Sequence, residues 1–177
     1  MNLRGKLTGA ILSTVLLAFV SCATDDAARA GAMDAGAIQA GAGADFSFVM
    51  NRDWMLVEVR TGGQVVTLNR DGFAALMGFS DLFTLRFEDG EHGLMAFGRA
   101  APNLYSGPFA QGANQDLSFG MMRSTMMAAL FELEELREHE FFAHLHNTTA
   151  WNIVGGNLEL RATADGAETV LVFAEDR

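Results

Sequence analysis

Three histidines, His139, His144 and His146, are the residues whose type most directly suggests metal or proton chemistry. Zinc ligands on a helix recur at i, i+3 or i+4. These histidines are five, two and seven positions apart, so only His139 and His146 share a helix face, two turns apart. Histidine near a helix C-terminus is also favoured by the helix dipole alone. We therefore predict no metal site here, and zinc is the alternative.

Four methionines, Met121, Met122, Met126 and Met127, could supply the soft thioether ligands that Cu(I) prefers. Methionine also fills irregular gaps in apolar cores. Because half of the chain is hydrophobic, we favour core packing over copper binding.

Nucleophilic catalysis has little support in the sequence. Ser106 and Ser124 both lie outside any G-x-S-x-G turn, in which a nucleophilic serine is commonly presented. Glu88 and Glu91 form a carboxylate pair at an expected turn, where exposure to water explains them. We predict no catalytic residues and no cofactor.

Asn103 and Tyr105 are the best polar candidates for a binding site. They could line a cavity, or they could satisfy backbone groups at a bend. We favour the structural role, because Asn, Tyr and Gly together suit a tight bend.

The only cysteine, Cys22, follows a segment typical of a signal peptide, residues 1–21. Arg4 and Lys6 give it a positive start, and residues 7–20 are apolar or small, too few for a stable membrane-spanning helix. The Ser21-Cys22 junction resembles the bacterial lipobox, which predicts lipidation of Cys22.

Two alternatives stand beside lipidation of Cys22. Phe19 stands where a lipobox usually has leucine, and ordinary signal peptidase could instead cleave after Ala23. The apolar segment could also be retained as an anchor helix. Lipidation gives the single cysteine a role, since an exposed unpaired thiol is a liability in an exported protein.

Residues 22–45 have the composition of a flexible tether. Of residues 23–45, 14 are Ala or Gly, and too few large apolar side chains are present to offset the entropy of ordering the segment. A coil of this length spans about 25–30 Å. We predict a tether that holds the following domain away from the membrane.

Residues 46–177 have a length suited to one domain with a single core. The chain from Cys22 onwards has 10 arginines, no lysine and 22 acidic residues, for a formal charge of −12. Such a surface repels nucleic acid and anionic lipid, so we predict no nucleic-acid partner and attachment to the membrane only through lipid.

Short alternating segments separated by turn residues predict a mainly β fold, an antiparallel sheet curled into a barrel. The clearest is residues 82–90, in which Phe83, Leu85 and Phe87 alternate with polar residues before Asp89-Gly90. The other expected strands are residues 54–60, 65–68, 93–99, 116–122, two segments around Gly155-Gly156, and 169–175.

Residues 125–146 contain no Gly or Pro and are rich in helix formers. We predict one helix there, with a break near Phe131, whose apolar stripe packs on the sheet or across the mouth of the barrel.

Three segments together resemble one family, the META domain, also called HslJ-like. Residues 98–109 resemble its G-C-N-x-Y-x-G-x-Y signature through Asn103, Tyr105, Gly107 and Phe109. The resemblance covers about residues 48–175. It implies a compact β-barrel-like envelope domain with one helix, often lipid-anchored, with no generally attributed activity or ligand.

The other two segments follow in the same order. Residues 125–129 resemble the family's T-x-M-A-C through Thr125 and Met127. Residues 138–145 resemble its E-x-x-F-x-x-x-L helix through Glu138, Phe141 and Leu145.

Both cysteines of the family pattern are replaced here, by Pro102 and Ala129. The joint loss suggests that these positions are neighbours in the fold, since a single remaining cysteine would be unpaired in an oxidising compartment.

The sequence thus predicts a lipid-anchored bacterial envelope protein, facing the periplasm or the cell surface, with a non-enzymatic binding or structural role. Its expected partners are the membrane, through lipid, and an envelope protein or small ligand. The alternative is a small hydrolase or a metal-handling protein.

Overall fold

The computed structural model describes residues 45–128 and 133–176. The predicted signal peptide, the lipidation site Cys22, nearly all of the predicted tether and Ala129 lie outside the described residues. The elements are η1 (Phe46–Phe48), β1 (Asp53–Thr61), β2 (Gln64–Thr67), α1 (Arg70–Met77), β3 (Thr84–Gly90), β4 (Gly93–Ala100), β5 (Asn103–Gln111), η2 (Ala113–Gln115), β6 (Leu117–Phe119), β7 (Arg123–Ser124), α2 (Glu138–His146), β8 (Thr148–Val154), β9 (Asn157–Ala164) and β10 (Ala167–Glu175).

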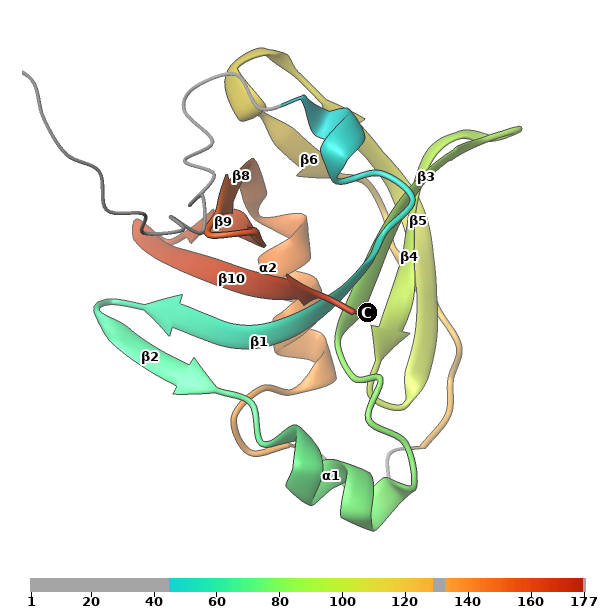
Figure 1. The fold of residues 1–177 in the computed structure, drawn as a ribbon, viewed down its shortest axis with the longest axis vertical. Helices are drawn as coiled ribbons and strands as arrows, with labels where there is room; N and C mark the ends of the chain where they lie inside the picture. Colours follow the sequence, from blue (N-terminus) through green and yellow to red (C-terminus); the bar gives the residue numbers. More distant parts are fainter. Residues whose placement is uncertain (1–44, 129–132, 177) are drawn as a thin grey trace, which may run out of the picture. The chain divides into compact units, whose positions relative to one another are not determined.

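Eight antiparallel strands curl into a nearly closed barrel (Figure 1). They are hydrogen-bonded in the order β6-β5-β4-β3-β1-β10-β9-β8, while β2 pairs with β1 and β7 pairs with β5. A single backbone bridge between Asp116 and Ala150 connects the two ends of this series, beside β6 and β8. The mainly β, barrel-like fold predicted from alternation is confirmed.

Strand β1 changes partners along its length. Its first residues, 53–55, pair with β3, whereas residues 58–61 pair with β2. A bulge between Leu56 and Glu58 interrupts its ladder with β10 at the point of change. Because a bulge bends a strand and increases its twist, β1 can serve both the barrel and the projecting β1–β2 hairpin.

Side chains fill the interior of the barrel. Toward one end, the ring of Phe46 from η1 packs against those of Phe87, Phe109 and Trp151, with centroids 4.9–5.5 Å apart. Trp54 is completely buried, and its indole Nε1 donates to the carbonyl oxygen of Val49 at 2.9 Å. The hydrogen bond satisfies the polar atom of an otherwise apolar side chain.

Helix α2 contributes to the other part of the core. Phe141 and Leu145 are fully buried, and the Phe141 ring lies 5.1 Å from Phe83 and 5.8 Å from Tyr105. The carboxylate of Glu140 accepts a hydrogen bond from the backbone N–H of Arg137, which satisfies a donor at the start of the helix.

The predicted helix over residues 125–146 is wrong in its first part. Residues 125–128 have no regular secondary structure, residues 133–137 are irregular, and α2 begins only at Glu138. The backbone of residues 125 and 127 is bound by β5 and Asn103, and these tertiary hydrogen bonds override local helix propensity.

Helix α1 and strand β5 were not among the predicted elements. Asn69 caps α1 by accepting from the backbone N–H of Gly72. Arg70 ties the helix to the barrel through hydrogen bonds to the carbonyl oxygens of Leu56 and Ser80. Burial lowers the pKa of the Arg70 guanidinium to about 10, and its Nε has no hydrogen-bond partner among the described residues.

Among the described residues, neither helix is long and apolar enough to cross a membrane.

Candidate functional site

Asn103 is the centre of a hydrogen-bonded group that we call the Asn103 cluster, formed by Asn103, Thr125, Met127 and Glu138. The Oδ1 of Asn103 accepts from the backbone N–H of Met127 at 2.7 Å and from the hydroxyl of Thr125 at 2.9 Å. Its Nδ2 donates to the Glu138 carboxylate at 2.9 Å and to the Met127 carbonyl oxygen at 3.3 Å. An amide side chain has two donors and two acceptor sites, so all four are used within the chain.

The Asn103 cluster fixes three segments that are distant in sequence. Asn103 begins β5, Thr125 and Met127 lie in the segment after β7, and Glu138 begins α2. The Thr125 hydroxyl also accepts from the backbone N–H of Leu104, and the Thr125 N–H donates to the Leu104 carbonyl oxygen. The cluster therefore positions the start of α2 against the barrel.

Tyr105 lies two residues along β5, opposite Gly98 on β4. Its hydroxyl donates to the carbonyl oxygen of Thr84 at 2.6 Å, on the strand beyond β4. A Cβ on Gly98 would lie 2.0 Å from that oxygen and 2.7 Å from the Tyr105 hydroxyl, so only glycine leaves room. Burial raises the pKa of the Tyr105 phenol above its ordinary value, so the hydroxyl stays protonated as a donor.

Gly107 and Phe109 complete the inward-facing row of β5. A Cβ on Gly107 would lie 2.5 Å from the sulfur of Met122 and 3.0 Å from the carbonyl oxygen of Met121. Glycine therefore allows the segment before β7 to close over β5. Phe109 packs in the core against Phe46 and Phe87.

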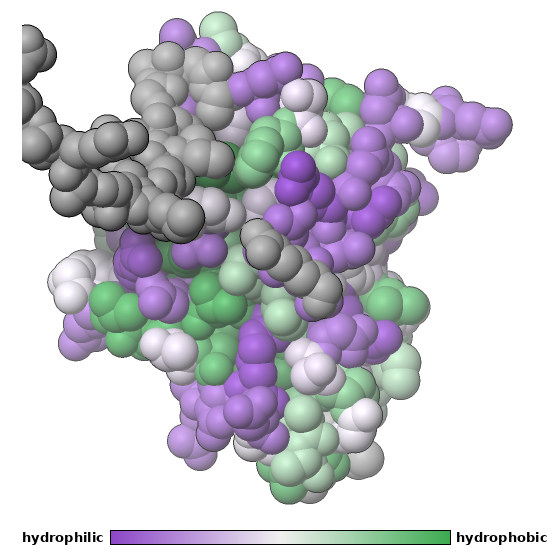
Figure 2. Space-filling view, in the orientation of Figure 1, coloured by the Kyte–Doolittle hydropathy of each residue, from purple (hydrophilic) through white to green (hydrophobic). Residues whose placement is uncertain are grey.

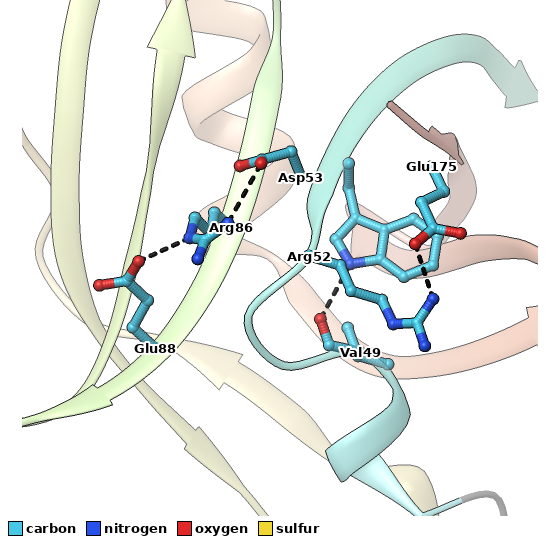
Figure 3. Close-up of polar contacts among 7 residues, drawn as sticks. Val49, Arg52, Asp53, Arg86, Glu88 and Glu175 are labelled. Carbon is cyan, nitrogen blue, oxygen red and sulfur yellow. Dashed lines mark hydrogen bonds and ion pairs between the residues drawn. The ribbon is translucent and has the colours of Figure 1, made fainter. Parts of the chain in front are cut away.

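A shallow surface cavity of about 340 Å³ opens above the Tyr105–Thr84 contact. Arg86 and Arg99 line it, but both are already paired. Arg86 binds the carboxylates of Glu88 and Asp53 at 2.6 and 3.1 Å, as Figure 3 shows. These hydrogen bonds, that of Glu88 first, raise the pKa of Arg86 above its ordinary value.

Arg99 is held by groups on both sides. Its Nε donates to the Asp81 carboxylate at 2.9 Å, and its Nη1 donates to the Pro102 carbonyl oxygen at 3.0 Å. The guanidinium carbon lies 5.0 Å from the centre of the Phe79 ring, a cation–π contact. The two cations of this cavity thus hold the outer face of the barrel together.

A second cavity, also of about 340 Å³, lies between the β1–β2 hairpin and α2; we call it the α2 groove. Val59 and Leu136 are its most buried apolar residues. Glu140 and His144, four residues apart on α2, line its side together with Glu135. Burial lowers the pKa of the His144 imidazole, against the opposing effect of Glu140, so the ring is neutral at pH 7.

The three histidines considered as metal ligands do not come together. His144 lines the α2 groove, whereas His139 and His146 are exposed. Within the described ranges, no three His, Cys, Asp or Glu side chains are grouped so as to hold a metal ion.

The methionines are less buried than a role in core packing predicts. Met126 is 99% exposed and Met121 83%, while Met122 is the one that packs against the core. Met127 is also exposed, at 59%, so three of the four candidate methionines lie at the surface.

The two candidate serines belong to the sheet. Ser106 pairs with Arg123 and Ser124 with Tyr105 in the ladder between β5 and β7. Glu88 is engaged by Arg86, so its role is an ion pair rather than one half of a carboxylate pair with Glu91.

Sequence reasoning missed Gly98, Thr84 and the groove that Glu140 and His144 line. Gly98 could have been found, because a glycine inside an alternating strand often marks a close approach. Thr84 could not, because its role depends on strand register.

The fold and the Asn103 cluster define a class: a small antiparallel β-barrel with one helix fixed by a polar group on its fifth strand. A model of the META domain family matches residues 47–176, so the chain belongs to this family. The NMR structure of a protein from Burkholderia xenovorans has a similar fold, with a TM-score of 0.55 and 18% identity over 82% of this chain and 97% of that one. No curated protein matches the chain.

Proposed function

We propose that the protein is a lipid-anchored component of the bacterial envelope, and that its META domain binds a partner or supports the envelope rather than catalysing a reaction. Support for the anchor comes from the sequence alone: a positive start, an apolar run and the Ser21-Cys22 junction. The membrane contact is then made by acyl chains, two or three of which give stable attachment.

The observation that carries the binding or structural role is the saturation of Asn103. Its amide uses all of its donors and acceptors on Thr125, Met127 and Glu138, inside a barrel whose interior is filled by side chains. A catalytic centre needs polar groups that are free to engage a substrate. This buried amide instead holds three segments of the chain together.

Exposed apolar side chains offer a contact surface close to the Asn103 cluster. Leu104 is 52% exposed, and Met126 and Met127 follow Thr125, which pairs with Leu104. Flexible, polarisable methionine side chains suit adaptable binding surfaces. An envelope protein or an apolar small ligand is the partner that this surface fits.

The anchor is tested by the variant Cys22→Ser. We expect wild-type protein in the membrane fraction with added acyl mass on Cys22, and the variant without it. An unmodified N-terminus at Thr24 in the wild-type protein would show ordinary secretion and exclude the anchor.

The binding role is tested by carboxylate-directed crosslinking in intact cells, because Lys6 is the only lysine of the chain. We expect a specific product that is lost when Leu104 and Met126 are both replaced by serine. Val154→Ser is the matched control, since Val154 is also exposed, at 45%, on β8. Equal yields from both variants would contradict a role for this surface, and turnover of a substrate would favour an enzyme.

A further inference from the structure

The α2 groove combines a hollow of ligand size with an apolar floor. Its volume of about 340 Å³ lies at the lower end of the range for small-molecule sites. Val59 of β1 and Leu136 before α2 are almost fully buried there, and Val66 of β2 is half-buried. Apolar surface also lies over the β1–β2 hairpin in Figure 2, in contrast to the hydrophilic tip of the β3–β4 hairpin.

The charge that lines the α2 groove has one sign. Glu135 and Glu140 line it, and no Arg or Lys among the described residues does. Among the described residues, the ion pairs of the barrel use other carboxylates, such as Glu58, Glu88 and Glu159. One oxygen of Glu140 accepts from Arg137 N–H, which leaves its other oxygen for a ligand.

His144 adds a polar group that has no hydrogen-bond partner in the described part of the chain. Its imidazole is half-buried and four residues after Glu140, so both side chains lie on the same face of α2. The charged groups that face it in the groove are Glu135 and Glu140; the lining residues of β1 and β2 are uncharged. A neutral imidazole leaves the negative field of the two carboxylates undiminished.

We propose that the α2 groove binds a small organic cation with an apolar body, an alkylamine or alkylguanidine. Its charged head lies between the Glu135 and Glu140 carboxylates, and its alkyl chain lies on Val59, Val66 and Leu136. Charge complementarity selects the head, and the buried apolar floor selects the body. This inference rests on the proposed binding role and names a ligand class for a site away from Leu104 and Met126.

The test is a titration of the full chain carrying Cys22→Ser with n-hexylammonium, followed by NMR shifts of the groove backbone amides and the His144 ring. We expect saturable shifts at the groove, and at least about tenfold weaker binding of n-hexanol and of hexanoate. Glu135→Gln and Glu140→Gln should each weaken binding by about two- to fivefold, and the Glu140→Gln side chain still accepts the Arg137 hydrogen bond.

Glu168→Gln is the matched control, since Glu168 is an exposed carboxylate on β10 outside the groove. The affinity of the Glu168→Gln variant for n-hexylammonium should equal that of the parent chain. Affinity should also fall between pH 7.5 and 5, as His144 gains a proton, and His144→Asn should remove most of that fall.

The proposal is overturned if n-hexylammonium leaves the groove signals unchanged, or if Glu168→Gln weakens binding as much as Glu135→Gln and Glu140→Gln. A crosslinked partner at Leu104 and Met126 with no ammonium binding would overturn this inference and leave the proposed function standing. Loss of both would count against a binding role altogether.

Discussion

The Tyr105 hydroxyl reaches across β4 to donate a hydrogen bond to the Thr84 carbonyl oxygen, 2.6 Å away on β3. The ladder between β3 and β4 extends only as far as Arg86 opposite Phe97. Beyond it, the backbone N–H of Arg99 binds the Thr84 side chain, and Tyr105 binds the Thr84 backbone. Hydrogen bonds that involve the Thr84 and Tyr105 side chains thus take the place of backbone pairing at this end of β3.

Tyr105→Phe should lower the free energy of unfolding by about 1–3 kcal/mol, because the Thr84 carbonyl loses its donor in a buried site. The ring and its packing on Phe141 and Phe142 are kept. Urea denaturation of the two proteins measures the difference. An unchanged midpoint would mean that water replaces the hydroxyl.

Gly98→Ala should destabilise the domain by about 1–3 kcal/mol or more, since the new Cβ would meet the Thr84 carbonyl oxygen at 2.0 Å. Gly90→Ala is the matched control in the adjacent strand. A Cβ at Gly90 meets nothing within 4 Å, so its thermal midpoint should stay close to that of the wild type. Equal effects of the two substitutions would refute the close-approach argument.

Asn103→Asp should destabilise by about 2–4 kcal/mol at pH 7.5, since it loses both donors and places a second carboxylate beside Glu138. Like charges raise the folded-state pKa of the pair above its unfolded value. The folded variant then binds more protons, so its deficit should shrink as the pH falls toward 4.5. Asn103→Ala, which adds no charge, should show a deficit without this additional pH dependence in denaturation curves.

His144 should make the domain less stable on acidification. Burial lowers its folded-state pKa below the unfolded value of 6.5, so the unfolded chain binds more protons as the pH falls through that window. The stability is fully present above pH 6.5 and is lost as the pH falls through the folded pKa. The wild type should therefore lose more stability than His144→Gln between pH 7.5 and 5; parallel curves would show that the imidazole is solvated.

Pro102→Cys together with Ala129→Cys should form a disulfide, as the family resemblance implies for these two positions. Met127, two residues before Ala129, is bound to Asn103, the residue after Pro102. Closing a loop of roughly 27 residues stabilises by about 3–4 kcal/mol in the chain-entropy model. Thiol titration and unfolding of oxidised and reduced protein, with Cys22 replaced by serine, measure it. Two persistent free thiols would contradict the alignment of these motifs.

The strands were predictable because alternation reports which side of a sheet is buried. Phe83, Leu85 and Phe87 are all buried, as their spacing predicts, even though Phe83 precedes β3. Turn residues placed the hairpin turn at Gly155-Gly156 correctly, whereas the turn expected at Asp89-Gly90 lies two residues later, at Glu91-His92, because Asp89 and Gly90 are still paired with β4.

The helices were less predictable, because local propensity says nothing about distant partners. Residues 126–128 are good helix formers, yet the segment is not helical, because Asn103 binds Thr125 and Met127. Helix α1 is eight residues long and contains Gly72, so its pattern is too short and too interrupted to stand out.

The residues of the candidate site were predictable, but their hydrogen-bond partners were not. Asn103, Tyr105, Gly107 and Phe109 form one inward-facing row of β5, which their spacing of two already indicates. Their partners on β3, β4 and α2 depend on register and on the path of the chain between elements.

The ring of Phe46 spans the gap in the barrel. On one side, the Phe46 ring contacts Phe109 of β5, the strand that pairs with β6. On the other side it contacts Trp151 of β8. The Asp116–Ala150 bridge joins these same two sides. Phe46 is also the first buried residue of the described chain and precedes every strand. A pulling force applied from the N-terminal side therefore acts on the Phe46 ring before it acts on any strand pairing. Pulling the ring out of the core would open the barrel where the isolated Asp116–Ala150 bridge joins its two ends.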